Sequence, residues 1–340
     1  MNEQIGVGVI GLGFMGARHI RAYAAAGREN PCRIVAVCDR DQDRLTGTAW
    51  GSGNIGSGAE NRLFDPAELA TYTDVEAMLA DESVELVSVC THTDTHVDTA
   101  IAALRAGKHV LVEKPVAIEP DDISRLAVAA DESGRLCMPA MCMRFWPAWA
   151  WLKDRIDDES FGRVQSAVFR RLGSMPTWAR DFYADESRSG GALVDLHIHD
   201  TDFVTHCFGM PRSVSSAGSV NHVTTAYRFS DAGPRHVVAE GAWGHSPSFG
   251  FHMSYLVSFE RATVSFDLAR EQQLVLYGHE RPEPIDVDSS SGYDGEIRAL
   301  LQAVRVKAPV PPATLREAVE VARVLGAERA SLLTGETVTL

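Results

Sequence analysis

The first 141 residues alternate short, continuous apolar runs with stretches of helical pattern, and this alternation constrains the fold more than any other feature. The expected strands are Ile5 to Ile10, Arg33 to Cys38, Leu86 to Cys90, His109 to Val112 and Leu136 to Met141. Helical patterns are expected at Asp41 to Ala49, Asp74 to Ala80, Asp94 to Ala106 and Glu119 to Ala130, with a first one at Phe14 to Ala26. Strands without polar alternation are buried on both faces, so the pattern predicts an α/β fold with a parallel, doubly wound sheet.

The second half follows a different pattern, which begins after Pro147. Its strands are longer and more alternating, and few helices separate them. We expect strands at Val164 to Leu172, His236 to Gly241, Met253 to Phe259 and Ala262 to Leu268, and helices at Leu193 to Cys207 and Thr314 to Thr334. The sequence therefore predicts a dinucleotide-binding domain over residues 1–142 and an α+β domain with a mostly antiparallel sheet over 143–340. The glycine-rich stretch Gly51 to Ala59 is expected to be a mobile loop.

Composition excludes several classes of partner. The net charge of −14 repels a nucleic-acid backbone, so no nucleic acid is expected. No apolar run approaches the roughly 20 residues of a membrane span, and no basic leader precedes the first strand, so we expect no membrane association. The six cysteines lie mostly in apolar runs without a Cys-x-x-Cys pair. Buried thiols in a reducing cytoplasm fit this usage better than disulfides or a structural metal.

A glycine-rich turn joins the first expected strand to the first expected helix. It reads Gly11-Leu12-Gly13-Phe14-Met15-Gly16. In this context the first glycine permits a tight turn, the second lets backbone approach a pyrophosphate, and the third allows close helix packing. Asp39 ends the second strand, where a carboxylate binds the adenosine ribose of NAD. Arg40 beside it could stack on adenine or pair with the additional phosphate of NADP, so NAD is predicted and NADP use is left open.

Polar residues also follow the next two strands. Thr91, Thr93 and His96 come after the third strand, at the edge where ligands of parallel sheets bind. His96 is either a nicotinamide contact or a capping and packing residue. Glu113-Lys114-Pro115 follows the fourth strand, and a partly buried Lys114 close to a cationic nicotinamide could transfer a proton. A solvated surface lysine is the alternative.

The segment Gly190 to Asp202 is the richest in titratable groups in the second half. On a continuous helix, Asp195, His199 and Asp202 would share one face. A carboxylate one turn from an imidazole orients it as a general base for an alcohol proton. Two alternatives are a metal site and a purely structural helix. His197 and His199 diverge by about 200° on a helix, which disfavours a metal site, and none is predicted.

Taken together, these motifs resemble the glucose-fructose oxidoreductase and inositol dehydrogenase family, often written Gfo/Idh/MocA. The resemblance spans nearly the whole chain and includes Arg144-Phe145 before Pro147. It implies catalytic roles for Lys114, Asp195 and His199, and an open C-terminal sheet that forms dimer or tetramer contacts. The sequence departs from the family pattern at His92, at Ala192 and in the loop of residues 51–59.

The expected activity is NAD-dependent oxidation of a secondary hydroxyl of a sugar, sugar derivative or inositol-like polyol. His199 or Lys114 would accept the hydroxyl proton. A glycosidase of the same fold with tightly bound NAD, or a cofactor-sensing regulator without catalysis, are the alternatives. Beyond Asp195 and His199, the candidate substrate contacts are Arg144, Trp178, Arg180 and Asp202. Trp146 and Trp149 could also line the pocket or simply pack in the core.

Overall fold

The computed structural model describes residues 4–27, 30–48, 62–177, 179–231 and 233–340. The chain separates into two compact units. The first comprises Met1–Cys142 with Ser291–Val319, and the second comprises Met143–Ser290 with Glu320–Leu340. The first unit therefore includes a late segment that the sequence analysis had assigned to the second domain.

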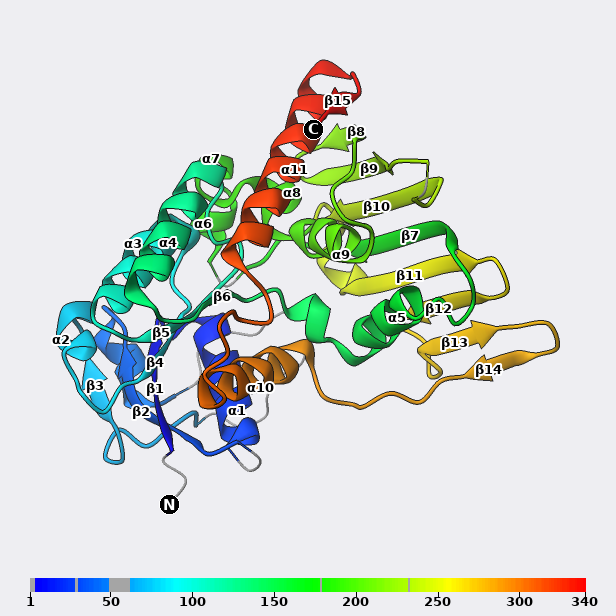
Figure 1. Cartoon of the computed structure of the whole chain (residues 1–340). Coiled ribbons are helices and arrows are strands. Elements are labelled where there is room, and N and C mark those ends of the chain that lie inside the picture. Colours follow the sequence, from blue (N-terminus) through cyan, green and yellow to red (C-terminus); the bar gives the residue numbers. More distant parts are fainter. Residues whose placement is uncertain (1–3, 28–29, 49–61, 178, 232) are drawn as a thin grey trace. The chain divides into compact units, whose positions relative to one another are not determined.

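A six-stranded parallel sheet forms the first unit, in the order β3-β2-β1-β4-β5-β6. The strands are β1 (Ile5–Ile10), β2 (Cys32–Cys38), β3 (Ala70–Tyr72), β4 (Leu86–Val89), β5 (His109–Val112) and β6 (Cys137–Pro139). The helices are α1 (Phe14–Ala26), α2 (Val75–Leu79), α3 (Thr93–Arg105), α4 (Pro120–Ser133) and α10 (Gly292–Arg305), with the short helix η1 (Gln42–Thr46). Figure 1 shows the sheet between the α3–α4 pair and the α1–α10 pair. The doubly wound α/β prediction is confirmed.

Local chemistry explains both the agreement and the misses in this unit. Strand β1 is buried at every residue, as its unbroken apolar run predicts. The helix expected at residues 41–49 is shorter. Asp41 caps η1 by accepting the N–H of Asp43, and Gly47 ends it at φ +83°. Strand β3 was missed because three residues are too few to show a period. The expected loop at residues 51–59 lies outside the described residues.

The second unit contains a nine-stranded, mostly antiparallel sheet in the order β14-β13-β12-β11-β7-β10-β9-β8-β15. Its strands are β7 (Val164–Leu172), β8 (Ser213–Ser219), β9 (His222–Arg228), β10 (His236–Ala242), β11 (His252–Phe259), β12 (Thr263–Asp267), β13 (Leu274–Tyr277), β14 (Pro282–Pro284) and β15 (Val338–Thr339). The helices are η2 (Cys142–Phe145), α5 (Pro147–Asp157), α6 (Arg180–Tyr183), α7 (Glu186–Ser189), α8 (Gly191–Asp195), α9 (Ile198–Phe208), η3 (Pro247–Phe249) and, from Glu320 onward, α11 (Leu315–Thr334), whose first five residues belong to the first unit. Only β7 and β10 pair in parallel among the described strands of this sheet.

An aromatic cluster holds helices α5 and α9 against one face of this sheet. The Trp149 ring is fully buried, and its centroid lies 4.6 Å from that of Phe266, 5.0 Å from that of Tyr255 and 6.5 Å from that of Phe203. These edge-on contacts are the geometry that aromatic pairs prefer. Trp149 is therefore a core residue, and its alternative placement in a substrate pocket was wrong.

The opposite face of the sheet is largely polar. Along β7 and β11 it carries Ser166, Arg170, Ser254 and Ser258 beside two apolar residues. A short apolar row nevertheless crosses paired strands at Ala226, Val238, Val168 and Leu256, and the side chain of Leu256 is 49% exposed. None of the helices in the described residues is long and apolar enough to cross a membrane.

Candidate active site

The three glycines of the turn after β1 differ in their surroundings. Gly11 has φ +87°, and a Cβ atom there would lie 2.7 Å from the Cys90 carbonyl oxygen. A Cβ at Gly16 would lie 2.0 Å from the Gly11 carbonyl oxygen. At Gly13, which precedes α1, the one atom of the described residues that lies within 4 Å of such a Cβ, apart from the glycine's own chain neighbours, is a nitrogen of Arg44 at 3.5 Å. Protein packing thus explains Gly11 and Gly16, while the open approach at Gly13 fits a ligand phosphate on the helix N-terminus.

Asp39 stands at the end of β2 and already supports this turn. Its Oδ2 accepts the Leu12 N–H at 2.7 Å, and its Oδ1 accepts the Asp41 N–H at 2.9 Å. A nitrogen of Arg44 lies 3.5 Å from Oδ2. A carboxylate has about four acceptor sites, so these contacts leave capacity for ribose hydroxyls. Arg40 is exposed beside it.

His96 connects two loops at the edge of the sheet. Its Nδ1 lies 2.9 Å from the Pro115 carbonyl oxygen and its Nε2 lies 3.0 Å from that of Thr91. Burial lowers the pKa of His96, although both carbonyl contacts oppose this shift. The side chain thus holds the loops after β4 and β5 together, which corresponds to the packing alternative. Thr93 is buried at the first position of α3.

Glu113 and Lys114 follow β5. One oxygen of Glu113 lies 2.8 Å from Nε2 of His19, and the other accepts the Lys114 N–H at 3.0 Å. Burial raises the pKa of Glu113, but the His19 hydrogen bond and the charges of His19 and Lys114 outweigh it, so the pKa falls below its usual value. Glu113 is therefore a buried anion beside the half-buried Lys114.

The single helix expected from Leu193 to Cys207 is wrong. Helix α8 ends at Asp195 and α9 begins at Ile198, so Asp195 and His199 lie on two helices. The premise of one shared helical face for Asp195, His199 and Asp202 fails with it. Leu196 and His197 both donate their N–H groups to the Ala192 carbonyl, which tightens the chain at the break. Asp195 and His199 are half-buried, whereas Asp202 is buried.

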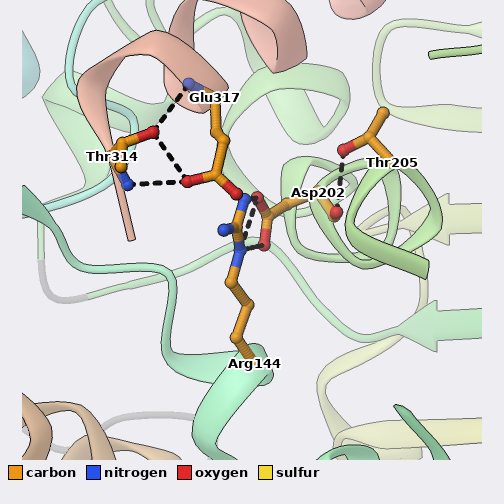
Figure 2. Close-up of polar contacts among 5 residues, drawn as sticks. All are labelled: Arg144, Asp202, Thr205, Thr314 and Glu317. Carbon is orange, nitrogen blue, oxygen red and sulfur yellow. Dashed lines mark hydrogen bonds and ion pairs between the residues drawn. The ribbon is translucent and has the colours of Figure 1, made fainter. Parts of the chain in front are cut away.

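Buried ion pairs anchor α9 to two other elements of the second unit. Asp200 accepts two hydrogen bonds from Arg171 of β7, each 3.0 Å long. Asp202 accepts three hydrogen bonds from Arg144 of η2, 2.7 to 3.2 Å long, and the two side chains are 1% and 4% exposed. Figure 2 shows this fork, together with the Thr205 hydroxyl, which donates to the Asp202 carbonyl. Arg144 and Asp202, both predicted substrate contacts, thus bind each other.

His197 takes part in a third anchor instead of a metal site. Its Nε2 lies 3.3 Å from the Glu328 carboxylate and 3.3 Å from the Tyr227 hydroxyl. Thr201 donates to Glu328 at 3.1 Å. All four side chains are buried. Three consecutive residues of α9, at positions 200 to 202, are therefore fixed from three directions, which holds the backbone that carries His199.

A comparison with protein families identifies both halves of the chain. A model described as an oxidoreductase family with an NAD-binding Rossmann fold matches residues 5–141, and the model of the GFO/IDH/MocA C-terminal domain matches residues 149–267. The chain belongs to the Gfo/Idh/MocA oxidoreductase family. The resemblance inferred from the motifs is confirmed, and so is NAD as the cofactor that the first unit is built to bind.

Known Gfo/Idh/MocA relatives carry names of sugar and inositol enzymes. The chain is 33% identical over 60% of its length to inositol 2-dehydrogenase 2 of Saccharopolyspora erythraea. It is 29% identical over 65% of its length to scyllo-inositol 2-dehydrogenase (NAD(+)) of Bacillus subtilis. The matches cover 53% and 59% of those relatives, so the chain spans little more than half of their length. An aldose-aldose oxidoreductase structure from Caulobacter crescentus shares the fold with a TM-score of 0.82, at 19% identity over 99% of this chain and 100% of that one.

Of the other candidate substrate contacts, Arg180 is the exposed first residue of α6, and Trp178 lies outside the described residues. The sequence analysis missed several partners of the site residues: His19, Arg44, Arg171 and Glu296. Only His19 had a local signal, because it follows the glycine turn on the buried side of α1. Arg44 contacts Asp39 and Asp41 from the short helix η1, whereas Arg171 and Glu296 meet groups far away in the sequence.

Proposed function

We propose that this chain is an NAD-dependent dehydrogenase that oxidises a secondary hydroxyl of a sugar, sugar derivative or cyclic polyol. One observation carries the proposal. The glycine turn, Thr91 and Lys114 follow β1, β4 and β5, which are neighbours in one parallel sheet. Their carboxyl ends therefore share one edge, and ligands of such sheets bind at this edge.

The first unit supplies the cofactor contacts in this proposal. The N-terminus of α1 and the backbone at Gly13 bind the pyrophosphate, and Asp39 accepts hydrogen bonds from the adenosine ribose. Thr91, Thr93 and the Glu113-Lys114 loop approach the nicotinamide end, while His96 shapes these loops from behind. NAD bound there supplies the hydride acceptor of the reaction.

The reaction moves a proton as well as a hydride, and the chain's own residues accept the proton. His199 or Lys114 takes it from the substrate hydroxyl as the carbinol C–H bond breaks. Asp195 orients His199 across the break between α8 and α9. The buried pair of Arg144 and Asp202 positions α9 in this proposal, since three charge-assisted hydrogen bonds join the two side chains. Arg180, exposed at the start of α6, remains the candidate for a carboxylate or hydroxyl of the substrate.

We also propose that the chain forms a homodimer or homotetramer through the open face of its nine-stranded sheet. The row from Ala226 to Leu256 is the apolar part of that face. Closed symmetry would cover it with the same row of a second copy.

A substrate panel tests the activity. Purified protein is incubated with NAD and with inositols, aldoses, sugar acids and glycosides, and reduced nicotinamide is followed by its absorbance. The proposal expects NADH formation in proportion to substrate consumed for at least one polyol or sugar. Cleavage of a glycoside without net NADH would indicate the glycosidase alternative, and tight NAD binding with no conversion of any compound would favour the regulator.

A further inference from the structure

Three buried side chains meet next to the Lys114 loop, and none of them is a proton acceptor in the proposed reaction. His19 comes from α1, Glu113 from the end of β5 and Glu296 from α10, all within the first unit. Each can offer one nitrogen or oxygen atom such that these atoms lie within 4.8 Å of one another. Tyr293 of α10 places its ring 5.4 Å from the Arg18 guanidinium of α1, which packs the two helices at this point.

Glu296 is the unusual member of this cluster. Its side chain is 0% exposed, and neither carboxylate oxygen has a hydrogen-bond partner in the part of the chain that the structure describes. A buried, ionised carboxylate without partners is strongly unfavourable. Glu113, in contrast, has a partner on each oxygen. The two carboxyl groups are thus close, but only Glu113 has hydrogen-bond partners among the described residues. A negative charge is therefore stabilised on Glu113 and not on Glu296.

Among the described residues, the charges that act most on Glu296 are negative, and the nearby Arg18 guanidinium packs on the Tyr293 ring. Around Glu113 lie His19, His96 and Lys114. The groups that act on Glu296, or are acted on by it, are Glu113, Asp294, Tyr23, Cys90 and Tyr293. Burial raises the pKa of Glu296 well above its usual value, and the charges of Glu113 and Asp294 act in the same direction.

We propose that Glu296 is protonated beside the Glu113 carboxylate, and that this carboxyl pair is a positioning element for Lys114. The role in catalysis rests on the proposed function. With Glu296 neutral, Glu113 is the single negative charge of the pair beside Lys114. Ionisation of Glu296 would add a second charge and favour the ammonium form of Lys114, which cannot accept a proton from an alcohol. The proton on Glu296 thus limits how strongly the negative charge of the two buried carboxyl groups favours the ammonium form of Lys114.

The arrangement around His19 supports a proton instead of a metal ion. Its Nε2 lies 2.8 Å from Glu113, an ordinary hydrogen-bond length, and its Nδ1 lies 3.1 Å from the Ser88 hydroxyl. Ser88 is in turn 2.9 Å from the Tyr23 hydroxyl. Both ring nitrogens are therefore engaged in hydrogen bonds, whereas a metal ion would need Nε2 without its proton.

Infrared spectroscopy of the whole protein tests the proton directly. The stretching band of a protonated, buried carboxyl group is expected at pH 8 in the native chain, and it should disappear in Glu296→Gln. This readout does not depend on turnover, so it separates the carboxyl pair from the proposed activity. Absence of the band in the native protein, or about one tightly bound divalent metal ion per chain in elemental analysis, would overturn the proposal.

The pH dependence of kcat/KM tests the role toward Lys114. Glutamine mimics a neutral glutamic acid, so Glu296→Gln should leave the rising limb unmoved. Glu113→Gln removes the anion and should shift the limb to lower pH by roughly one unit, the size of effect that one nearby charge has on a titrating group. A shift in Glu296→Gln as large as that in Glu113→Gln would mean that Glu296 is ionised in the native enzyme. Should Glu296→Gln fail to fold, the infrared band and metal content of the native protein still decide.

Discussion

Replacing Asp202 by asparagine is expected to destabilise the second unit before it affects substrate binding. The carboxylate accepts three hydrogen bonds from Arg144, and both side chains are almost fully buried. Asparagine replaces the anion of this buried pair with a neutral group, and breaking such a pair typically costs about 3 to 5 kcal/mol. In a domain of this size each kcal/mol lowers the melting temperature by about 2 to 4 °C. Asp202→Asn should therefore lower it by roughly 6 to 20 °C.

Two companion variants make the result interpretable. In the double variant Arg144→Met, Asp202→Leu no charge remains buried, so most of the lost stability should return. Asp157→Asn is the matched control in the same unit. It removes an ion pair between Lys153 and the Asp157 side chain, which is 59% exposed. This change should lower the free energy of unfolding by less than about 1 kcal/mol. Differential scanning calorimetry measures all three. A native melting temperature in Asp202→Asn combined with a raised KM would refute the positioning role and restore Asp202 as a substrate contact.

The other predictions concern the cofactor, the chemistry, the sheet face and acid stability. Asp39→Ala should weaken NAD binding and relax the preference over NADP, measured by titration calorimetry, and unchanged selectivity would remove Asp39 from ribose recognition. Lys114→Ala and His199→Ala should each lower the rate of hydride transfer by roughly 10² to 10⁴ with little change in NAD affinity, and full turnover would exclude the residue concerned. Leu256→Arg should dissociate the oligomer in light scattering, while a native chain that is already monomeric at micromolar concentration would contradict the proposed interface. Burial lowers the pKa of His96 in the folded state, so the unfolded chain binds its proton first and the free energy of unfolding should fall as pH drops below about 6.5. The acid slope should be shallower in His96→Gln, and equal slopes would argue against this contribution.

Local sequence patterns predicted most of the first unit because most of its strands and helices carry their own signals. The apolar run Ile5–Ile10, the glycine turn and the helix Phe14–Ala26 are where the pattern places them. Helix α10 was missed although Ser291 and Asp294 form a capping box, a local signal that was available. Its return to the first unit, and hence the meeting of Glu296 with Glu113, depends on tertiary packing that no local pattern encodes.

The break between helices α8 and α9 shows why the site could be predicted only in part. The pattern from Leu193 to Cys207 is helical throughout, yet the chain breaks after Asp195. The buried contact of His197 with Glu328 joins residues far apart in the sequence. The same applies to Arg171 with Asp200 and to Arg144 with Asp202, whose partners lie on separate elements. Residue types and spacing thus supplied candidates, while the pairing of charges across the fold shows that Arg144 and Asp202 bind each other.

Transfer of a labelled hydride tests the central claim most directly. A substrate found in the panel is prepared with deuterium on the carbinol carbon and incubated with NAD, and the reduced cofactor is analysed by mass spectrometry and NMR. The account predicts one deuterium on nicotinamide C4 per product formed, a slower reaction than with the unlabelled compound, and loss of transfer in His199→Ala or Lys114→Ala. Product formation with no deuterium in the cofactor would contradict it, and so would transfer at the native rate in both variants.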